Sequence, residues 1–141
     1  MVINRVLRAV SLAATLSLAS QAGAQQTLGH GEHVKPVFQQ KLPNVPGKSI
    51  IAAIVTYDPG GKSPPHHHAG SAFIYAQVLS GSIRSKVDDA PVRIYKTGES
   101  FYEAPGSKHS ISENASKKVP ASLLTVFIVD FDDNKLTVPD N

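Results

Sequence analysis

Three consecutive histidines close the stretch Gly60-Gly61-Lys62-Ser63-Pro64-Pro65-His66-His67-His68, and another histidine, His109, follows forty-one residues later. In an extended strand, alternate side chains point to the same side, so His66 and His68 face one way and His67 the other. Neutral imidazole is the commonest protein ligand for first-row metals. A third imidazole from His109 would complete a three-nitrogen face and leave the opposite side of the metal open, as in reactive metal sites. We therefore predict that His66, His68 and His109 bind a metal.

Short runs rich in β-branched and aromatic residues surround these histidines, and each run ends in turn residues. No segment after the first twenty-four residues keeps a helical period for three turns. Many short strands at regular spacing predict an antiparallel sandwich or barrel. The expected strands cover residues 34–39, 49–57, 72–79, 82–87, 91–95, 100–103, 110–112 and 123–130.

Residues 1–24 have the composition of a secretory signal peptide. Arg5 and Arg8 precede a short apolar run, and Ala22-Gly23-Ala24 gives the small-residue cleavage pattern. The apolar run is well short of the roughly 20 residues that a membrane-spanning helix needs. We predict cleavage before Gln25 and a periplasmic or secreted protein, with no membrane contact after cleavage. The two arginines are not adjacent, so the twin-arginine export signal is missing and the chain is expected to cross the membrane unfolded.

Removing the leader leaves 117 residues with 12 basic and 11 acidic side chains, so the formal charge falls from +3 to about +1. This balance gives no indication of a nucleic-acid surface. Cysteine is absent, which excludes disulfides, thiolate metal ligands and cysteine nucleophiles. We divide the mature chain into a polar N-terminal arm, residues 25–46, and one domain, residues 47–141.

The motifs resemble those of the cupin superfamily. Its first motif, a glycine, five residues and His-x-His, is matched by Gly60, His66 and His68, and the glycine that closes it by Gly81. Its second motif is approached by Gly98, Ala104-Pro105-Gly106 and His109, with the proline displaced by one position. The resemblance implies an all-β fold, an antiparallel double-sheet jelly roll over residues 34–138. It also implies a homodimer, because cupins often pair through sheet edges.

One part of the first motif is missing. Cupins commonly carry a glutamate at the position that falls here on Phe73 or Ile74, and residues 69–81 contain no acid. The chain therefore resembles the three-histidine cupins, some of which are dioxygenases that cleave diketones or related chelating substrates. Without that carboxylate, three neutral imidazoles would leave the full divalent charge on the metal, which favours an anionic two-oxygen ligand.

Two further residues are candidates for catalysis. Glu103, six residues before His109, would serve as fourth ligand, general base or acceptor for an imidazole N–H, or else it is a solvated strand-end acid. Gln77 would reach the pocket as a hydrogen-bond donor, or else it is an ordinary polar strand residue. Aromatic residues on the strands beside the motifs are candidate pocket walls, namely Phe73, Tyr75, Phe101 and Tyr102.

These observations favour an exported metal-binding cupin that acts on a small chelating organic molecule, with a dioxygenase as the leading hypothesis. The expected cofactor is a divalent first-row metal, with iron for oxygen chemistry and zinc, manganese, nickel or copper as alternatives. A Lewis-acid isomerase or decarboxylase stays open, and so does a non-catalytic protein that binds a small ligand or the metal itself. The sequence does not decide whether the site is catalytic.

Overall fold

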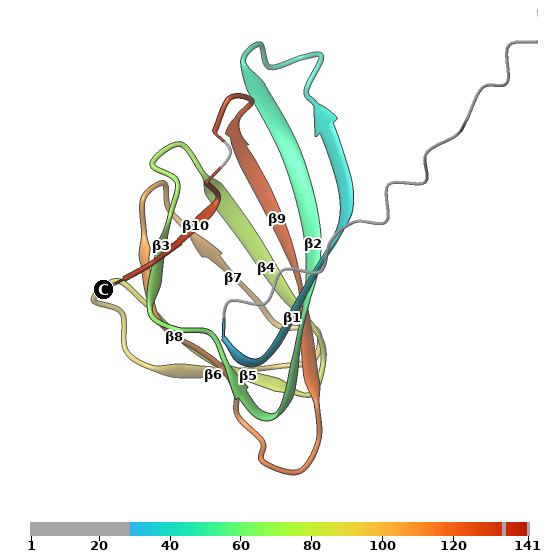
Figure 1. The fold of residues 1–141 in the computed structure, drawn as a ribbon, viewed down its shortest axis with the longest axis vertical. Helices are drawn as coiled ribbons and strands as arrows, with labels where there is room; N and C mark the ends of the chain where they lie inside the picture. Colours follow the sequence, from blue (N-terminus) through green and yellow to red (C-terminus); the bar gives the residue numbers. More distant parts are fainter. Residues whose placement is uncertain (1–28, 134, 141) are drawn as a thin grey trace, which may run out of the picture.

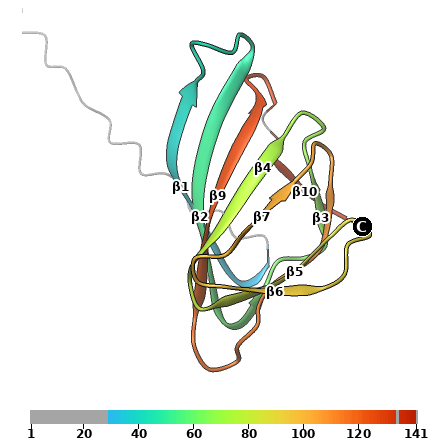
Figure 2. The ribbon, with the colours of Figure 1, turned by 180° about the vertical axis from the view of Figure 1, so that it is seen from behind.

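The computed structural model describes residues 29–133 and 135–140, and the predicted signal peptide, residues 1–24, lies outside this part of the chain. The described residues form ten β-strands and no helix, and every strand pairing is antiparallel. Two sheets face each other and form a nearly closed barrel (Figures 1 and 2). The predicted antiparallel jelly roll is confirmed. Among the described residues no helix is long and apolar enough to cross a membrane.

The larger sheet has the order β1-β2-β9-β4-β7. Its strands are β1 (His30–Lys41), β2 (Lys48–Lys62), β9 (Ala121–Asp130), β4 (Phe73–Ser80) and β7 (Ser100–Glu103). The sheet is held by long, regular ladders, because β9 pairs with β2 along ten residues and with β4 on its other edge. Strand β7 is the edge strand next to β4.

The smaller sheet has the order β6-β5-β8-β3-β10. Its strands are β6 (Arg93–Lys96), β5 (Ser82–Val87), β8 (Lys108–Asn114), β3 (His66–His68) and β10 (Thr137–Pro139). The two sheets are joined where the end of β2 pairs with β8 at Lys62 and Glu113. Strand β3, which carries the histidines, therefore lies between β8 and the late strand β10.

The N-terminal arm is more ordered than the sequence analysis expected. The predicted strand 34–39 extends to His30–Lys41, and this β1 pairs with β2 along most of its length. Strand β2 likewise continues past the predicted turn at residues 58–61 as far as Lys62. Glycine makes this possible: Gly60 has φ +74°, and a Cβ on Gly61 would lie 2.6 Å from the carbonyl oxygen of Gly31. The glycines allow close strand packing here as well as a change of direction.

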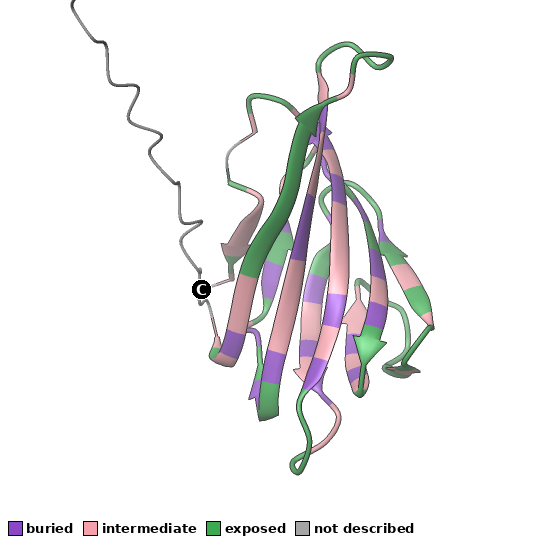
Figure 3. Cartoon of the chain, turned by 90° about the vertical axis from the view of Figure 1, so that its right-hand side faces the viewer, coloured by how far each residue is buried: buried purple, intermediate pink, exposed green. Residues whose placement is uncertain are grey.

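The interior contains two apolar clusters at different heights between the sheets. The first consists of Tyr57, Ala76, Val78, Ile83, Ala121 and Leu123. The second consists of Ala72, Ile74, Phe127 and Val129. Buried and less buried residues alternate along the strands, as the two-residue period requires (Figure 3). Both clusters contact the histidines of the candidate site: Phe127 of the second lies beside His68, and Phe101, which packs against the first, lies beside His109.

Candidate metal centre

The two histidine motifs meet on neighbouring strands of the smaller sheet. His66 on β3 pairs in register with His109 on β8. His66, His68 and His109 are buried and face the barrel interior, where one nitrogen of each lies within 4.8 Å of the others. His67 points outward and contacts Asp140, with Nδ1 2.9 Å from Oδ1. The strand alternation predicted from the sequence therefore brings these three histidines together and leaves His67 outside.

Backbone carbonyl groups orient the two histidines of β3. The Nδ1–H of His66 donates to the carbonyl oxygen of Pro64 at 2.8 Å, and that of His68 donates to the carbonyl oxygen of Leu136 at 3.0 Å. A carbonyl oxygen can only accept, so both rings carry a proton on Nδ1. In the neutral rings, Nε2 is then the nitrogen with a free lone pair, as a metal ligand requires.

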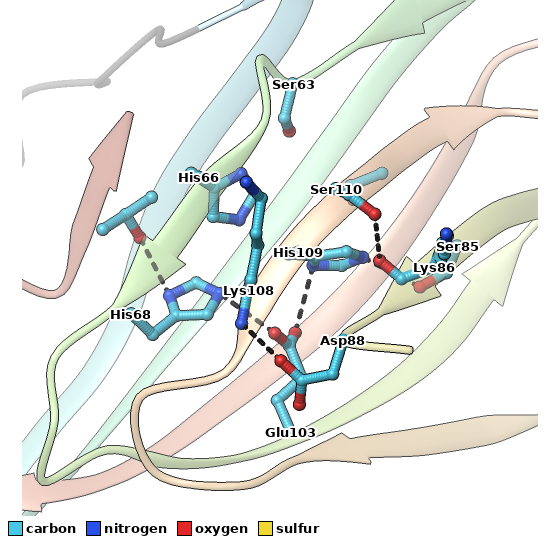
Figure 4. A network of polar contacts seen from close by, with 12 residues as sticks. Ser63, His66, His68, Ser85, Lys86, Asp88, Glu103, Lys108, His109 and Ser110 are labelled. Carbon is cyan, nitrogen blue, oxygen red and sulfur yellow. Dashed lines mark hydrogen bonds and ion pairs between the residues drawn. The ribbon is translucent and has the colours of Figure 1, made fainter. Parts of the chain in front are cut away.

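A serine side chain holds the third imidazole. The Nε2 atom of His109 lies 2.8 Å from Ser85 Oγ on β5, and its Nδ1 atom lies 3.2 Å from Glu103 Oε1. When the Ser85 hydroxyl accepts from Nε2–H, Nδ1 has the free lone pair. Each imidazole therefore has one nitrogen anchored to the protein and the other available to the shared centre. The rings of His68 and His109 lie beside the Glu103 carboxylate (Figure 4).

Glu103 approaches the same centre from the larger sheet. Its side chain is 3% exposed, and Oε2 lies 3.3 Å from His68 Nε2 without the alignment of a hydrogen bond. The turn after β7 fixes this approach: Ser107 N donates to Ala104 O at 3.0 Å, and Gly106 supplies the φ of +75° that a type II turn needs after Pro105. The carboxylate and the imidazoles thus face one another across the barrel interior.

The surroundings determine the charge of these groups. Burial lowers the pKa of His66 to about 4, despite the hydrogen bond to Pro64, so this ring is neutral at neutral pH. Burial would raise the pKa of Glu103. Where the His109 and His68 rings turn an N–H toward the carboxylate in the metal-free protein, these hydrogen bonds outweigh burial and lower the pKa to about 2. Aromatic rings close the site on two sides, with Phe127 5.6 Å from the His68 ring and Phe101 5.9 Å from the His109 ring. Imidazole nitrogens and an ionised carboxylate in a buried site fit a divalent first-row ion.

A cavity of about 490 Å³ opens on the His109 side of this centre. Ser85, which contacts His109, and Phe101, whose ring packs against it, form part of its wall. Arg93 also lines the cavity, where its guanidinium pairs with Glu99 at 3.2 Å and lies over the Tyr95 ring. None of the three histidines lines this cavity, and its wall combines aromatic surface with Asp88 and the Glu99-paired Arg93.

The structure does not bring every predicted residue to the site. Gln77 lies on the face of β4 opposite Ile74, Ala76 and Val78, away from the histidines, because side chains alternate along the strand; it is not retained as a site residue. Phe73 and Tyr75 share that outer face and are exposed. Of the four aromatic candidates, Phe101 faces the interior, and Tyr102 lines the cavity although it is two-thirds exposed.

Three partners of the histidines were missed in the sequence analysis. These are the carbonyl groups of Pro64 and Leu136 and the hydroxyl of Ser85. Backbone acceptors leave no trace in residue identity, and Ser85 resembles any polar residue in a strand. The pairing of β5 with β8 brings Ser85 to His109, and the pairing of β10 with β3 brings Leu136 to His68, whereas Pro64 meets His66 two residues along the chain.

Comparison with known families agrees with this geometry. The family model that describes a cupin domain matches residues 53–127, more than half of the chain, and the match includes both histidine motifs. The chain belongs to the cupin family. Among curated proteins, no significant match to this cupin is found.

Several solved structures share the fold of this cupin. A recombinant oxalate oxidase in complex with glycolate is 23% identical with a TM-score of 0.61; the alignment covers 85% of this chain and 60% of the oxidase chain. A cupin-2 domain from Rhodospirillum rubrum is 15% identical with a TM-score of 0.60, covering 82% and 69%. KdgF from Halomonas sp. is 16% identical with a TM-score of 0.58, covering 82% and 94%. At these identities the likeness establishes the fold.

Proposed function

We propose that this cupin is a metal-dependent oxidoreductase that oxidises a small chelating organic acid, enolate or diketone with molecular oxygen. The observation that carries the proposal is the orientation of the three imidazoles. Each has one nitrogen anchored, to Pro64 O, Leu136 O or Ser85 Oγ, and the other turned to a common centre. When bound there, a divalent ion would supply Lewis acidity and, for iron, manganese or copper, redox chemistry.

The cavity beside His109 supports a small anionic substrate. Its volume suits a molecule of a few heavy atoms together with water. Arg93, which pairs with Glu99, and the aromatic residues Tyr95, Phe101 and Tyr102 form part of its wall. The resemblance to an oxalate oxidase structure that holds glycolate points to the same class of substrate, a small acid with two neighbouring oxygens.

Oxygen uptake by the metal-loaded protein tests the proposal. Protein purified without an affinity tag is loaded separately with iron, manganese, zinc and copper, then given oxalate, glycolate and a simple β-diketone. We expect oxygen consumption with at least one substrate and a redox metal, lost in His109→Ala and kept in His67→Ala. Conversion without oxygen would replace the proposal with a Lewis-acid isomerase or decarboxylase. If the protein binds one metal ion per chain but converts no substrate, the proposal would be replaced by that of a non-catalytic binding protein.

We also propose that residues 1–24 export the protein, so that the metal is acquired outside the cytoplasm. The support is the leader sequence described above, with Arg5 and Arg8 before the apolar run and Ala22-Gly23-Ala24 at its end. N-terminal sequencing of the protein recovered from a bacterial periplasmic fraction tests this. We expect the mature chain to begin at Gln25, and retention of Met1 in a cytoplasmic fraction would contradict the proposal.

A further inference from the structure

We infer that Glu103 is the fourth protein ligand of the metal and that it binds the ion directly through its carboxylate. The inference rests on the metal centre of the proposed function and adds to it a negatively charged ligand from the opposite sheet. Four observations carry it: the distances around the carboxylate, the direction of the imidazole lone pairs, the state of the buried oxygen, and the register of β7 against β4.

The distances are those between ligands that share one ion. Glu103 Oε1 lies 3.2 Å from His109 Nδ1, and Oε2 lies 3.3 Å from His68 Nε2. Two ligand atoms bound at about 2.1 Å lie about 3.0 Å apart when they meet at a right angle and about 3.4 Å apart in a tetrahedron. The carboxylate therefore already stands at ligand spacing from two of the three imidazoles.

The direction of the lone pairs calls for a positive charge between these groups. His68 gives its Nδ1–H to Leu136 O, so a neutral His68 presents the lone pair of Nε2 to Glu103. Nitrogen and carboxylate lone pairs repel when nothing lies between them. Either a second proton on His68 or a metal cation removes this repulsion. A bound cation does so for His68 and His109 together.

The burial of one carboxylate oxygen also supports a bound metal ion. Glu103 is 3% exposed, and Oε2 is buried without a hydrogen-bond partner in the described part of the chain. A buried charge is stable when it is paired or bound to a metal. An acceptor for an imidazole N–H would explain Oε1 beside His109. It would not explain Oε2, because the one proton of neutral His68 is already donated elsewhere.

The register of the larger sheet explains why β7 carries this ligand. Glu103 pairs across the ladder with Ile74 on β4, and both side chains face the interior. Ile74 is 1% exposed and belongs to an apolar cluster with Phe127. Paired residues have Cβ atoms about 4.5–5.5 Å apart, so a carboxylate on either residue reaches the same region. The chain therefore places on β7 an acid that β4 lacks.

A direct carboxylate ligand changes the net charge of the metal with its protein ligands from the value that the sequence analysis expected. It cancels one of the two positive charges of the ion, whereas three imidazoles alone would cancel none. Four protein ligands still leave two positions of a six-coordinate ion, enough for the two oxygens of a chelating substrate. The site accordingly suits a substrate that binds by chelation and carries one negative charge or more.

The experiment uses zinc as a probe, because zinc binding is measured without any turnover. In a crystal structure of the zinc-loaded protein we expect a Glu103 oxygen at about 2.0–2.2 Å from the ion. In solution, Glu103→Gln should weaken zinc binding more than about 100-fold, beyond the roughly 10–100-fold typical of groups that only orient ligands. The matched control Glu113→Gln, on β8 and paired with Arg84, should change it less than about threefold.

A charge-relocation variant completes the test. Replacing Ile74 with Glu and Glu103 with Ile moves the acid to the paired position, and it should recover most of the affinity that Glu103→Gln loses. Zinc bound by the imidazoles with Glu103 only hydrogen-bonded to a ring or to water would overturn the inference and leave the metal centre intact. Failure of the wild-type protein to bind zinc would overturn the metal centre itself. If the relocated variant does not fold, the crystal structure and Glu103→Gln still decide.

Discussion

Ile74 and Glu103 face each other across neighbouring strands, and both side chains point into the barrel. The sequence has no acid where the first cupin motif usually carries one, at Phe73 or Ile74. The carboxylate nevertheless reaches two of the three histidines, His68 and His109, because the partner strand supplies it at the paired position. A motif can thus lose a residue while the interior keeps the functional group.

The first prediction concerns the ligand histidines. His66→Ala should weaken zinc binding more than about 100-fold, because a nitrogen turned to the centre is removed, while His67→Ala should leave it nearly unchanged. Isothermal titration and metal analysis of the purified variants measure both. Loss of binding in His67→Ala with retention in His66→Ala would show that the register of β3 is wrong.

The second prediction concerns Ser85. Ser85→Ala removes the partner of His109 Nε2, which frees the ring to turn or to change tautomer, and should weaken metal binding about 10–100-fold. Ser110→Ala is the matched control. It deletes a hydroxyl from the same pair of strands, one that donates to the Lys86 carbonyl oxygen and not to a histidine among the residues that the structure describes. Equal effects of the two substitutions in metal titrations would rule out a specific role for Ser85.

The third prediction is the pH dependence of the metal-free protein. The pKa of His66 falls from 6.5 in the unfolded chain to about 4 in the fold, so between these values only the unfolded chain binds the proton. The free energy of unfolding should therefore drop by about 3 kcal/mol as the pH falls from 6.5 to 4, and this contribution is zero above that range. Urea unfolding at several pH values measures it.

His66→Gln should flatten this dependence, whereas His67→Gln, with an exposed ring, should keep it. The pKa of Glu103, about 2, adds a separate loss of stability below pH 4.5, where the unfolded chain binds a proton first. If the free energy of unfolding had the same pH dependence in the wild type and in His66→Gln, the lowered pKa of His66 would not be its cause.

The histidine cluster could be predicted because it depends on local rules. His66 and His68 share a side through strand alternation, and His109 follows a turn whose Pro105 and Gly106 are evident in the sequence. The strands 82–87 and 100–103 have the predicted bounds for the same reason, since turn residues flank both. Strand alternation and turn residues were therefore enough to predict the histidine ligands and the positions of most strands.

The orientation of β4 could not be predicted, because large apolar residues lie on both of its faces. Phe73 and Tyr75 alternate with Ile74 and Val78, and hydrophobicity alone does not say which set is inside. For this reason the sequence leaves open whether Gln77 reaches the pocket or is an ordinary polar strand residue. The position of Glu103 depends on the pairing of β7 with β4, which is a property of the assembled sheet.

The fourth prediction concerns β10. Removing residues 136–141 deletes the carbonyl acceptor of His68 and the strand paired with β3, so metal affinity should fall about 10–100-fold while circular dichroism still shows a β-sheet protein. Asp140→Asn is the control. It removes the negative charge that faces His67 and Lys108 at the surface and should change the free energy of unfolding by less than about 1 kcal/mol. Unchanged affinity after truncation would show that His68 needs no partner at Leu136.

The pairing of β10 with β3 also fixes when the centre can form during the life of the chain. His68 and the carbonyl group that orients it are 68 residues apart in sequence, so a ribosome produces His68 well before the group that sets its direction. A nascent chain therefore holds its histidines without the geometry of the finished site. For a chain that crosses a membrane unfolded, as proposed, the ion is selected only after the last strand has arrived. The compartment of arrival, rather than the compartment of synthesis, then decides which metal the protein carries.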